Sequence, residues 1–114
     1  MPFDVLQRLL RPMSRRPVTS SYPDHPLRLP SEVRGLPELD ADRCDGTAAC
    51  AAICPTQAIS LAGPVWVLDA GKCVMCGACV AVCPRDALRL GEQVELATLD
   101  RSQLIVTRTW RDGP

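Results

Sequence analysis

The chain has 114 residues and a formal net charge of zero, with 13 basic and 13 acidic side chains. This length supports one domain, or a small domain with tails. Aromatic residues make up only 4%, so we expect no large aromatic core, and a core that thin usually needs a bound metal or cluster for stability. Residues 1–37 carry a net charge of +3 and residues 38–114 carry −3. This balance argues against nucleic acid as a partner, because nucleic-acid binders carry a basic patch or stripe.

The number of cysteines, seven, is odd, so they cannot all pair in disulfides. We expect no secretory signal, because Asp4, Gln7, Arg8 and Arg11 interrupt the apolar residues at the N-terminus. No segment approaches the ~20 apolar residues of a membrane-spanning helix. The expected compartment is therefore the cytosol, where thiols stay reduced, and the cysteines are interpreted as metal ligands.

Residues 1–16 are predicted to form an amphipathic helix. Its apolar side chains recur at helical spacing, with arginines between them: Phe3, Leu6, Leu9, Leu10 and Met13. Pro12 and Pro17 separate this helix from the rest of the chain. Two interpretations remain open: the helix packs on its own domain, or it lies on a membrane surface or a partner subunit.

Residues 17–37 form a proline-rich segment that is predicted to be extended and irregular. It contains Pro17, Pro23, Pro26, Pro30 and Pro37, a density that no helix or inner strand tolerates. An ordered stretch of this kind needs a surface to lie on, which indicates an arm that wraps around a neighbour. His25, the only histidine, is interpreted as an exposed loop residue.

Residues 38–91 contain an internal repeat with an offset of 29 residues, which aligns Cys44 with Cys73 and Pro55 with Pro84. Each half is predicted to be a cysteine loop, a short helix and a strand, so the fold class is α+β with a duplicated domain. The predicted strands are Ile59–Leu61, Val65–Asp69 and Leu88–Leu90, with a turn at Gly63-Pro64. The predicted core consists of Ile53, Ile59, Val65, Val67, Val82, Leu88 and Leu90.

Residues 92–114 form a short C-terminal tail. Leu104-Ile105-Val106 is predicted to be a strand, either at the edge of the domain or as part of a tail that docks on a partner.

The second cysteine run is Cys73-Val-Met-Cys76-Gly-Ala-Cys79-Val-Ala-Val-Cys83-Pro84. Its spacing, C-x2-C-x2-C-x3-C-P, is that of bacterial [4Fe–4S] ferredoxins. The first run, from Cys44 to Pro55, has the same frame with Thr47 in place of the second cysteine. Zinc sites use paired cysteines in a different spacing, so an iron–sulfur cofactor is the favoured interpretation.

The repeat resembles the two-cluster ferredoxin family, in which the last cysteine of each run binds the cluster of the other run. The resemblance implies a first [4Fe–4S] cluster on Cys73, Cys76, Cys79 and Cys54, and a second on Cys44, Cys50 and Cys83. Thr47 leaves one position of the second cluster open, because a hydroxyl is a poor iron ligand. The second site could hold [3Fe–4S], hold [4Fe–4S] capped by a ligand other than cysteine, or be empty. We expect it to be occupied; Asp45 is in the wrong frame to replace residue 47.

A wider resemblance covers nearly the whole chain. The segments Thr19–Pro23, Arg34–Leu39 and Val94–Thr109, together with the first cysteine run, resemble the iron–sulfur subunit of respiratory complex I and its short versions in formate hydrogenlyase and membrane-bound [NiFe] hydrogenases. This resemblance implies a non-catalytic electron-transfer subunit, peripheral on the inner face of the cell membrane. Its expected partners are an electron-input subunit and a hydrogenase-like small subunit.

Two alternatives remain at this point. The first is a free soluble ferredoxin, which would not need residues 1–37. The second is a structural metal-binding interaction module, in which the second site is degenerate and the arm only bridges subunits.

Overall fold

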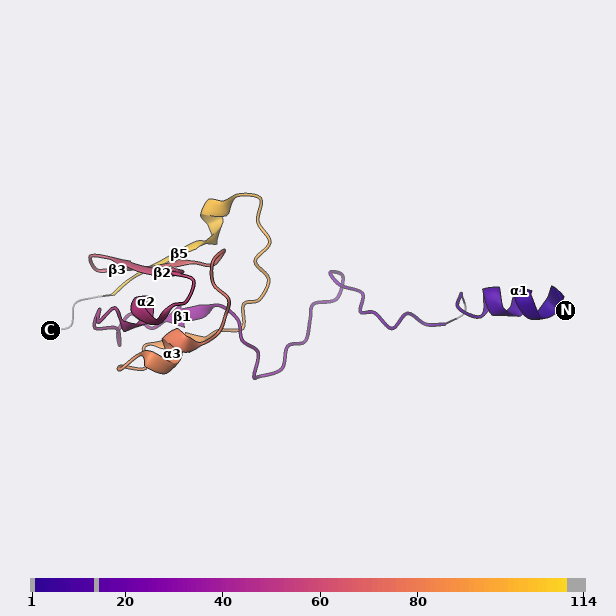
Figure 1. Ribbon diagram of the computed structural model, residues 1–114, viewed down its shortest axis with the longest axis horizontal. Helices are drawn as coiled ribbons and strands as arrows, with labels where there is room; N and C mark the ends of the chain where they lie inside the picture. Colours follow the sequence, from indigo (N-terminus) through magenta and orange to yellow (C-terminus); the bar gives the residue numbers. More distant parts are fainter. Residues whose placement is uncertain (1, 14, 111–114) are drawn as a thin grey trace.

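The computed structural model describes residues 2–13 and 15–110, which combine short helices and short strands. Their order is α1 (Pro2–Leu10), β1 (Pro37–Leu39), α2 (Ala49–Ile53), β2 (Ile59–Ala62), β3 (Val65–Asp69), α3 (Ala78–Val82), β4 (Leu88–Leu90), η1 (Arg101–Leu104) and β5 (Ile105–Thr109). The molecule measures 82 × 29 × 25 Å. Figure 1 shows why it is so long: both sheets gather at one end, and α1 lies at the far end of an extended arm.

A three-stranded antiparallel sheet in the order β2-β3-β5 forms one layer of the folded part. β2 and β3 are joined by the predicted turn, and Ala62 pairs with Val65 across it. β5 pairs with the other edge of β3, so that Asp69 lies opposite Ile105. The predicted strands at 59–61 and 65–69 are confirmed, with β2 one residue longer. β5 is an edge strand, as one of the two interpretations of the tail expected, but Leu104 belongs to η1 instead.

A second, two-stranded sheet pairs β1 with β4. Glu38 lies opposite Arg89, and their side chains form an ion pair with a distance of 2.6 Å between Oε2 and Nη2. The predicted strand at Leu88–Leu90 is confirmed, whereas β1 was not predicted. β1 accommodates Pro37 because proline is tolerated as the first residue of an edge strand. This pairing attaches the end of the arm to the cysteine-containing part.

The hydrophobic core lies between the sheets and the cysteine loops, and its most deeply buried large side chains are Trp66 and Leu68 of β3, exposed by 1% and 0%. Ile59 and Leu88 are buried as predicted. Val65, Val67 and Leu90 are only half-buried, and Ile53 and Val82 are exposed by 47% and 37%. The prediction chose the wrong face of β3, since alternate residues of a strand point to opposite sides. Ile53 and Val82 lie at the ends of five-residue helices, which are too short to bury a continuous stripe.

The arm joins α1 to the folded part. α1 ends at Leu10, earlier than the predicted end at residue 16, and one further backbone bond runs from the Arg11 N–H to the Gln7 carbonyl at 2.9 Å. All the apolar side chains expected on the helix are exposed by more than half, so the interpretation that α1 packs on its own domain is wrong. The predicted helix positions 1 and 14 lie outside the described residues. No helix within residues 2–13 and 15–110 is long and apolar enough to cross a membrane.

The proline-rich arm contains no helix or strand between residues 15 and 36, as expected. It contacts the tail through Tyr22, whose pKa is raised because its hydroxyl donates a hydrogen bond to the Glu95 carboxylate. Closer to the folded part, the backbone N–H of Gly35 donates to the Gly91 carbonyl at 2.9 Å. Carbonyl oxygens of Gly91 and Gln93 occupy the space that a side chain at position 35 would need, so glycine permits this close approach.

Candidate metal centres

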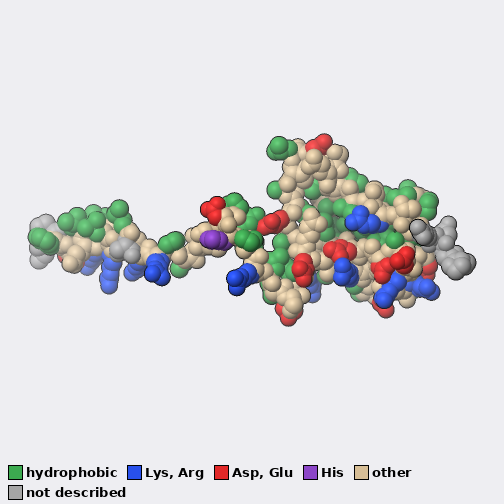
Figure 2. Space-filling model, turned by 180° about the vertical axis from the view of Figure 1, so that it is seen from behind, with side chains coloured by type: hydrophobic (Ala, Val, Ile, Leu, Met, Phe, Trp, Pro, Cys, Tyr) green, Lys and Arg blue, Asp and Glu red, His purple; other side chains and the backbone are tan. Residues whose placement is uncertain are grey.

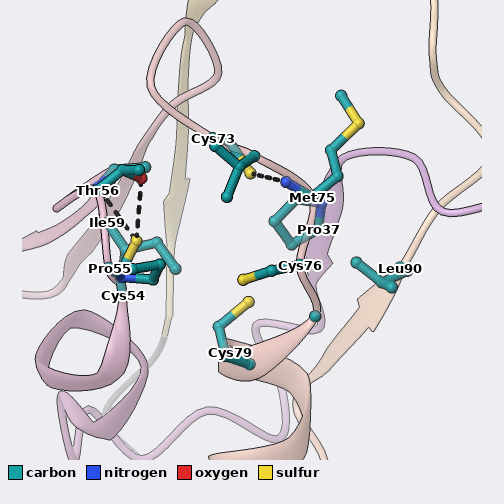
Figure 3. A pocket seen from close by; sticks show the side chains of 14 residues that line it. Pro37, Cys54, Pro55, Thr56, Ile59, Cys73, Met75, Cys76, Cys79 and Leu90 are labelled. Atoms are coloured by element: carbon teal, nitrogen blue, oxygen red, sulfur yellow. Dashed lines mark hydrogen bonds between the residues drawn. The ribbon is translucent and has the colours of Figure 1, made fainter.

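Four cysteines from both runs line one pocket. Cys73, Cys76 and Cys79 come from the loop before α3 and from its first turn, and Cys54 follows the end of α2. Figure 3 shows the sulfur atoms of Cys76 and Cys79 close to one another, with that of Cys54 across the pocket. The structure therefore brings together the four residues expected at the first cluster, although they are separated by up to 25 positions in the sequence.

The loop around the first pocket curls through backbone conformations that side chains rarely adopt. Met75 and Gly77 have positive φ values of 54° and 79°, and the left-handed conformation at Met75 costs roughly 1–2 kcal/mol for a residue with a Cβ. The curl turns the Met75 N–H toward Cys73, whose Sγ accepts it at 3.4 Å. Successive backbone N–H groups in such a concave turn favour an anion, which a thiolate-bound cluster would provide.

A second pocket is lined by the remaining cysteines, Cys44, Cys50 and Cys83. Thr47 lines the same pocket at the position where the second run has Cys76. The backbone N–H of Thr47 donates to the Asp45 carboxylate at 3.2 Å. All seven expected ligands thus line two pockets, four in one and three in the other. This is the division that the spacing implies, while their role as ligands stays a prediction.

The loops around the two pockets repeat the same backbone geometry at positions 29 residues apart. Positive φ values recur at three aligned pairs, which are Gly46 and Met75, Ala48 and Gly77, and Gln57 and Asp86. The aligned cysteines Cys54 and Cys83 each accept a backbone N–H four residues later, from Ala58 and Ala87, both at 3.3 Å. In each half, this bond holds the sulfur atom against a turn that begins at the proline after the cysteine.

The thiols of the first pocket differ in how strongly they hold their protons. Burial raises the pKa of Cys79 to about 11, because a thiolate loses solvation in an apolar site. Burial also raises the pKa of Cys54, but hydrogen bonds from the Ala58 N–H and the Thr56 hydroxyl outweigh this effect and leave the pKa lowered. Binding of cationic iron deprotonates coordinating thiols, so such binding would offset the cost of forming a buried thiolate at Cys79.

Two tryptophans that were not predicted to be site residues lie at the second pocket: Trp66 lines it, and Trp110 packs against its loop. Trp110 is buried and packs against Gly46, where an added Cβ would lie 2.9 Å from the indole ring. Trp66 lines the pocket next to Cys50. Burial raises the pKa of Cys50, and the Trp66 indole N–H opposes this increase. Trp66 Nε1 nevertheless completes no hydrogen bond with any described residue, so the N–H faces the thiol without reaching it.

The donor set fits an iron–sulfur cluster. Cysteine thiolates are the ligands of such clusters, and here they line two pockets, four in one and three in the other. Among residues 2–13 and 15–110, no three His, Cys, Asp or Glu side chains are close enough together to bind a single metal ion. His25 is exposed in the arm, as expected, and lines neither pocket. The Trp66 N–H is buried and unpaired, and it is a donor available to a group bound in the second pocket, which Trp66 lines.

Comparisons with known proteins agree with these pockets. Residues 43–87 match the family described as a 4Fe-4S dicluster domain. A segment of 43 residues is 42% identical to formate hydrogenlyase subunit 6 of Escherichia coli (strain K12), and covers 38% of this chain and 24% of that protein. The fold is similar to a chain in the structure of the membrane-bound sulfane sulfur reductase, an archaeal respiratory membrane complex. That match has a TM-score of 0.71 and 34% identity, and covers 84% of this chain and 55% of the other.

The chain thus spans about half the length of the solved chain, and the aligned segment about a quarter of formate hydrogenlyase subunit 6. The expected resemblance to two-cluster ferredoxins and to the iron–sulfur subunits of formate hydrogenlyase is confirmed. Residues 43–87 are thus similar to the 4Fe-4S dicluster domain family, and the chain is similar to formate hydrogenlyase subunit 6 and to a chain of a respiratory membrane complex.

Proposed function

We propose that this chain is a non-catalytic electron-transfer subunit of a membrane-associated hydrogenase or complex I-like oxidoreductase. The observation that carries the proposal is the pair of pockets, each lined by cysteines from both runs. A bound iron–sulfur cluster would supply reversible one-electron oxidation and reduction there. The chain's own residues hold the thiolates in place, present backbone N–H groups to sulfur, and restrict the access of water.

The first site is proposed to bind [4Fe–4S] through Cys73, Cys76, Cys79 and Cys54. The second is proposed to bind [4Fe–4S] or [3Fe–4S] through Cys44, Cys50 and Cys83, with Thr47 at the open position. Two features support occupancy of the second site: its three cysteines lie together around one pocket, and its loop repeats the positive φ values of the first.

The folded part is proposed to be a duplicated ferredoxin-type domain over residues 38–91, preceded by the helix of residues 1–16 and the arm of residues 17–37, and followed by the tail of residues 92–114. The 29-residue offset between α2 and α3, and between their flanking turns, supports the duplication. Each half provides three positions of one site and the last cysteine of the other, so neither half completes a site alone.

The partners are proposed to be an electron-input subunit and a hydrogenase-like small subunit, with the complex on the inner face of the cell membrane. The two similar proteins are named as a formate hydrogenlyase subunit and as part of a respiratory membrane complex. The surface of α1 supports docking on a partner. Figure 2 shows apolar side chains along one side of α1 and arginines on the other. These apolar side chains are exposed in the isolated chain, Phe3 by 80%.

Replacement of one cluster ligand tests the relay. In the assembled complex, the Cys76→Ser variant should lose most electron flux and the signal of one cluster, because serine is a poor ligand for iron. Subunit stoichiometry should be unchanged. The matched control is Ala81→Ser, an exposed position in the same cysteine run that lines neither pocket, which should retain both flux and signal.

The two alternatives predict different results. A structural metal-binding module predicts that Cys76→Ser weakens assembly while the activity of the remaining complex is intact. A free ferredoxin predicts that deletion of residues 1–30, which leaves β1 and the core intact, does not change electron delivery, whereas the proposed subunit should lose its place in the complex.

A further inference from the structure

One side chain at the second pocket has a polar group with no assigned role. Trp66 lies in β3, the central strand of its sheet, and is exposed by 1%. Its Nε1 is the one buried side-chain nitrogen or oxygen among residues 2–13 and 15–110 that has no hydrogen-bond partner. Such groups are rare in native proteins, because an unpaired buried donor loses its hydrogen bond to water without replacement. Trp66 lines the second pocket, and a group bound there would supply the missing acceptor.

The position of Trp66 defines what that acceptor is. The side chain lines the second pocket together with Cys50, Leu61 and Cys83, and its N–H lies next to the Cys50 thiol. Asp45 and Thr47 also line this pocket, but the Cys50 thiol is the acceptor that the indole N–H faces. A thiolate or an inorganic sulfide in this pocket would accept the N–H.

We infer that the Trp66 indole N–H donates a hydrogen bond to sulfur at the second site and raises the reduction potential of the cluster bound there. This inference rests on the proposed function and deepens it. A donor stabilises the reduced state more than the oxidised state, because reduction adds negative charge to the cluster sulfurs. Hydrogen bonds to sulfur are one of the ways in which proteins set these potentials.

The inference also predicts an asymmetry between the sites. The first pocket has no indole in its described lining, and the residue 29 positions before Trp66 is Pro37, which lines that pocket and has no N–H. At the first site, the groups near the cysteine sulfurs are the Met75 and Ala58 N–H groups and the Thr56 hydroxyl. Trp66 is therefore a positioning residue for one site only, and its removal should affect the two clusters differently.

The test is an EPR-monitored redox titration of the full chain reconstituted anaerobically with iron and sulfide. Thr47→Cys assigns the signal of the second site, because this substitution changes only that site. In Trp66→Phe, we expect the reduced-to-oxidised ratio of the second cluster to fall about tenfold at a fixed potential, which is about 59 mV for one electron. The midpoint of the first cluster should be unchanged.

A second variant separates the N–H from packing. Benzothienylalanine at position 66 keeps nearly the size of the indole but lacks the donor, so it should lower the same midpoint even if Trp66→Phe fails to fold. A midpoint unchanged with benzothienylalanine would overturn the inference, as would equal shifts at both sites. Absence of a second cluster from the wild-type chain would instead overturn the proposed occupancy of that site, and this inference with it.

Discussion

Thr47 is the position at which the first cysteine run departs from the second. The structure places it on the wall of the second pocket, together with the three cysteines expected to bind there. Asp45 is engaged locally, since its carboxylate accepts the Thr47 N–H. The chemistry of this site therefore depends on whether the Thr47 hydroxyl takes part in binding.

Two substitutions at Thr47 distinguish the possible clusters. If the wild-type site holds [3Fe–4S], Thr47→Cys should gain about one iron per chain and convert the signal to that of [4Fe–4S], because four thiolates complete a cube. Thr47→Ala should then resemble the wild type.

If the hydroxyl caps a [4Fe–4S] cluster, Thr47→Ala should lose iron instead, and Thr47→Cys should keep the iron content. Iron analysis with EPR measures both results. An iron content and signal that neither substitution alters would contradict any account in which the cluster contacts position 47.

At the scale of the elements, β3 connects the core to the second site. Trp66 and Leu68 face the core, whereas Val65, Val67 and Asp69 lie on the half-buried side. Asp69 accepts hydrogen bonds from the Gly71 N–H and from Arg101 of η1. The strand thus holds the indole at the second pocket while its other face attaches the turn before the second cysteine run.

The orientation of β3 predicts unequal effects of two neighbouring substitutions. Leu68→Ala should lower the free energy of unfolding by about 2–5 kcal/mol, the usual range for a buried leucine. Val67→Ala should cost clearly less, because Val67 is half-buried and smaller. Urea unfolding of both variants measures the difference, and equal losses would show that the assigned face is wrong.

Much of this part of the fold was predictable from the sequence. The cysteine spacing and the repeat predicted both pockets and their crossed composition, and the turn residues predicted the β2–β3 hairpin. The inward face of β3 was not predictable from hydrophobicity, because Val65 to Leu68 are all apolar and only tertiary packing selects the side. β1 was missed because Pro37 and Glu38 conceal a three-residue edge strand, and Trp66 gave no signal that it would reach the second pocket.

At the scale of the whole molecule, the helix α1 is held away from the folded part by an arm. α1 is internally supported by the ion pair between Arg8 and Asp4, 3.4 Å apart, but exposed pairs of this kind contribute little stability. An isolated helix of nine residues is marginal in water, so its ordering depends on a surface that covers the apolar side. A membrane-associated complex would supply that surface.

Two substitutions that each add one negative charge test this role of α1. Leu6→Glu places a carboxylate on the apolar side and should reduce the fraction of the chain that co-purifies with membranes or with the complex by about tenfold, since burial of one leucine is worth roughly 1.5–3 kcal/mol. Gln7→Glu adds the same charge on the polar side and should have little effect. Iron content should be the same in both variants, and equal retention of both would contradict a docking role for α1.

The central claim is that thiolates from both cysteine runs hold iron and sulfide in two pockets of one chain. The most direct measurement is the iron and acid-labile sulfide content of the anaerobically purified full-length chain, together with its EPR spectrum before and after reduction. The account predicts a coloured protein with iron and sulfide in amounts that exceed one [4Fe–4S] cluster, and signals from two distinct clusters. A colourless protein without acid-labile sulfide would contradict it.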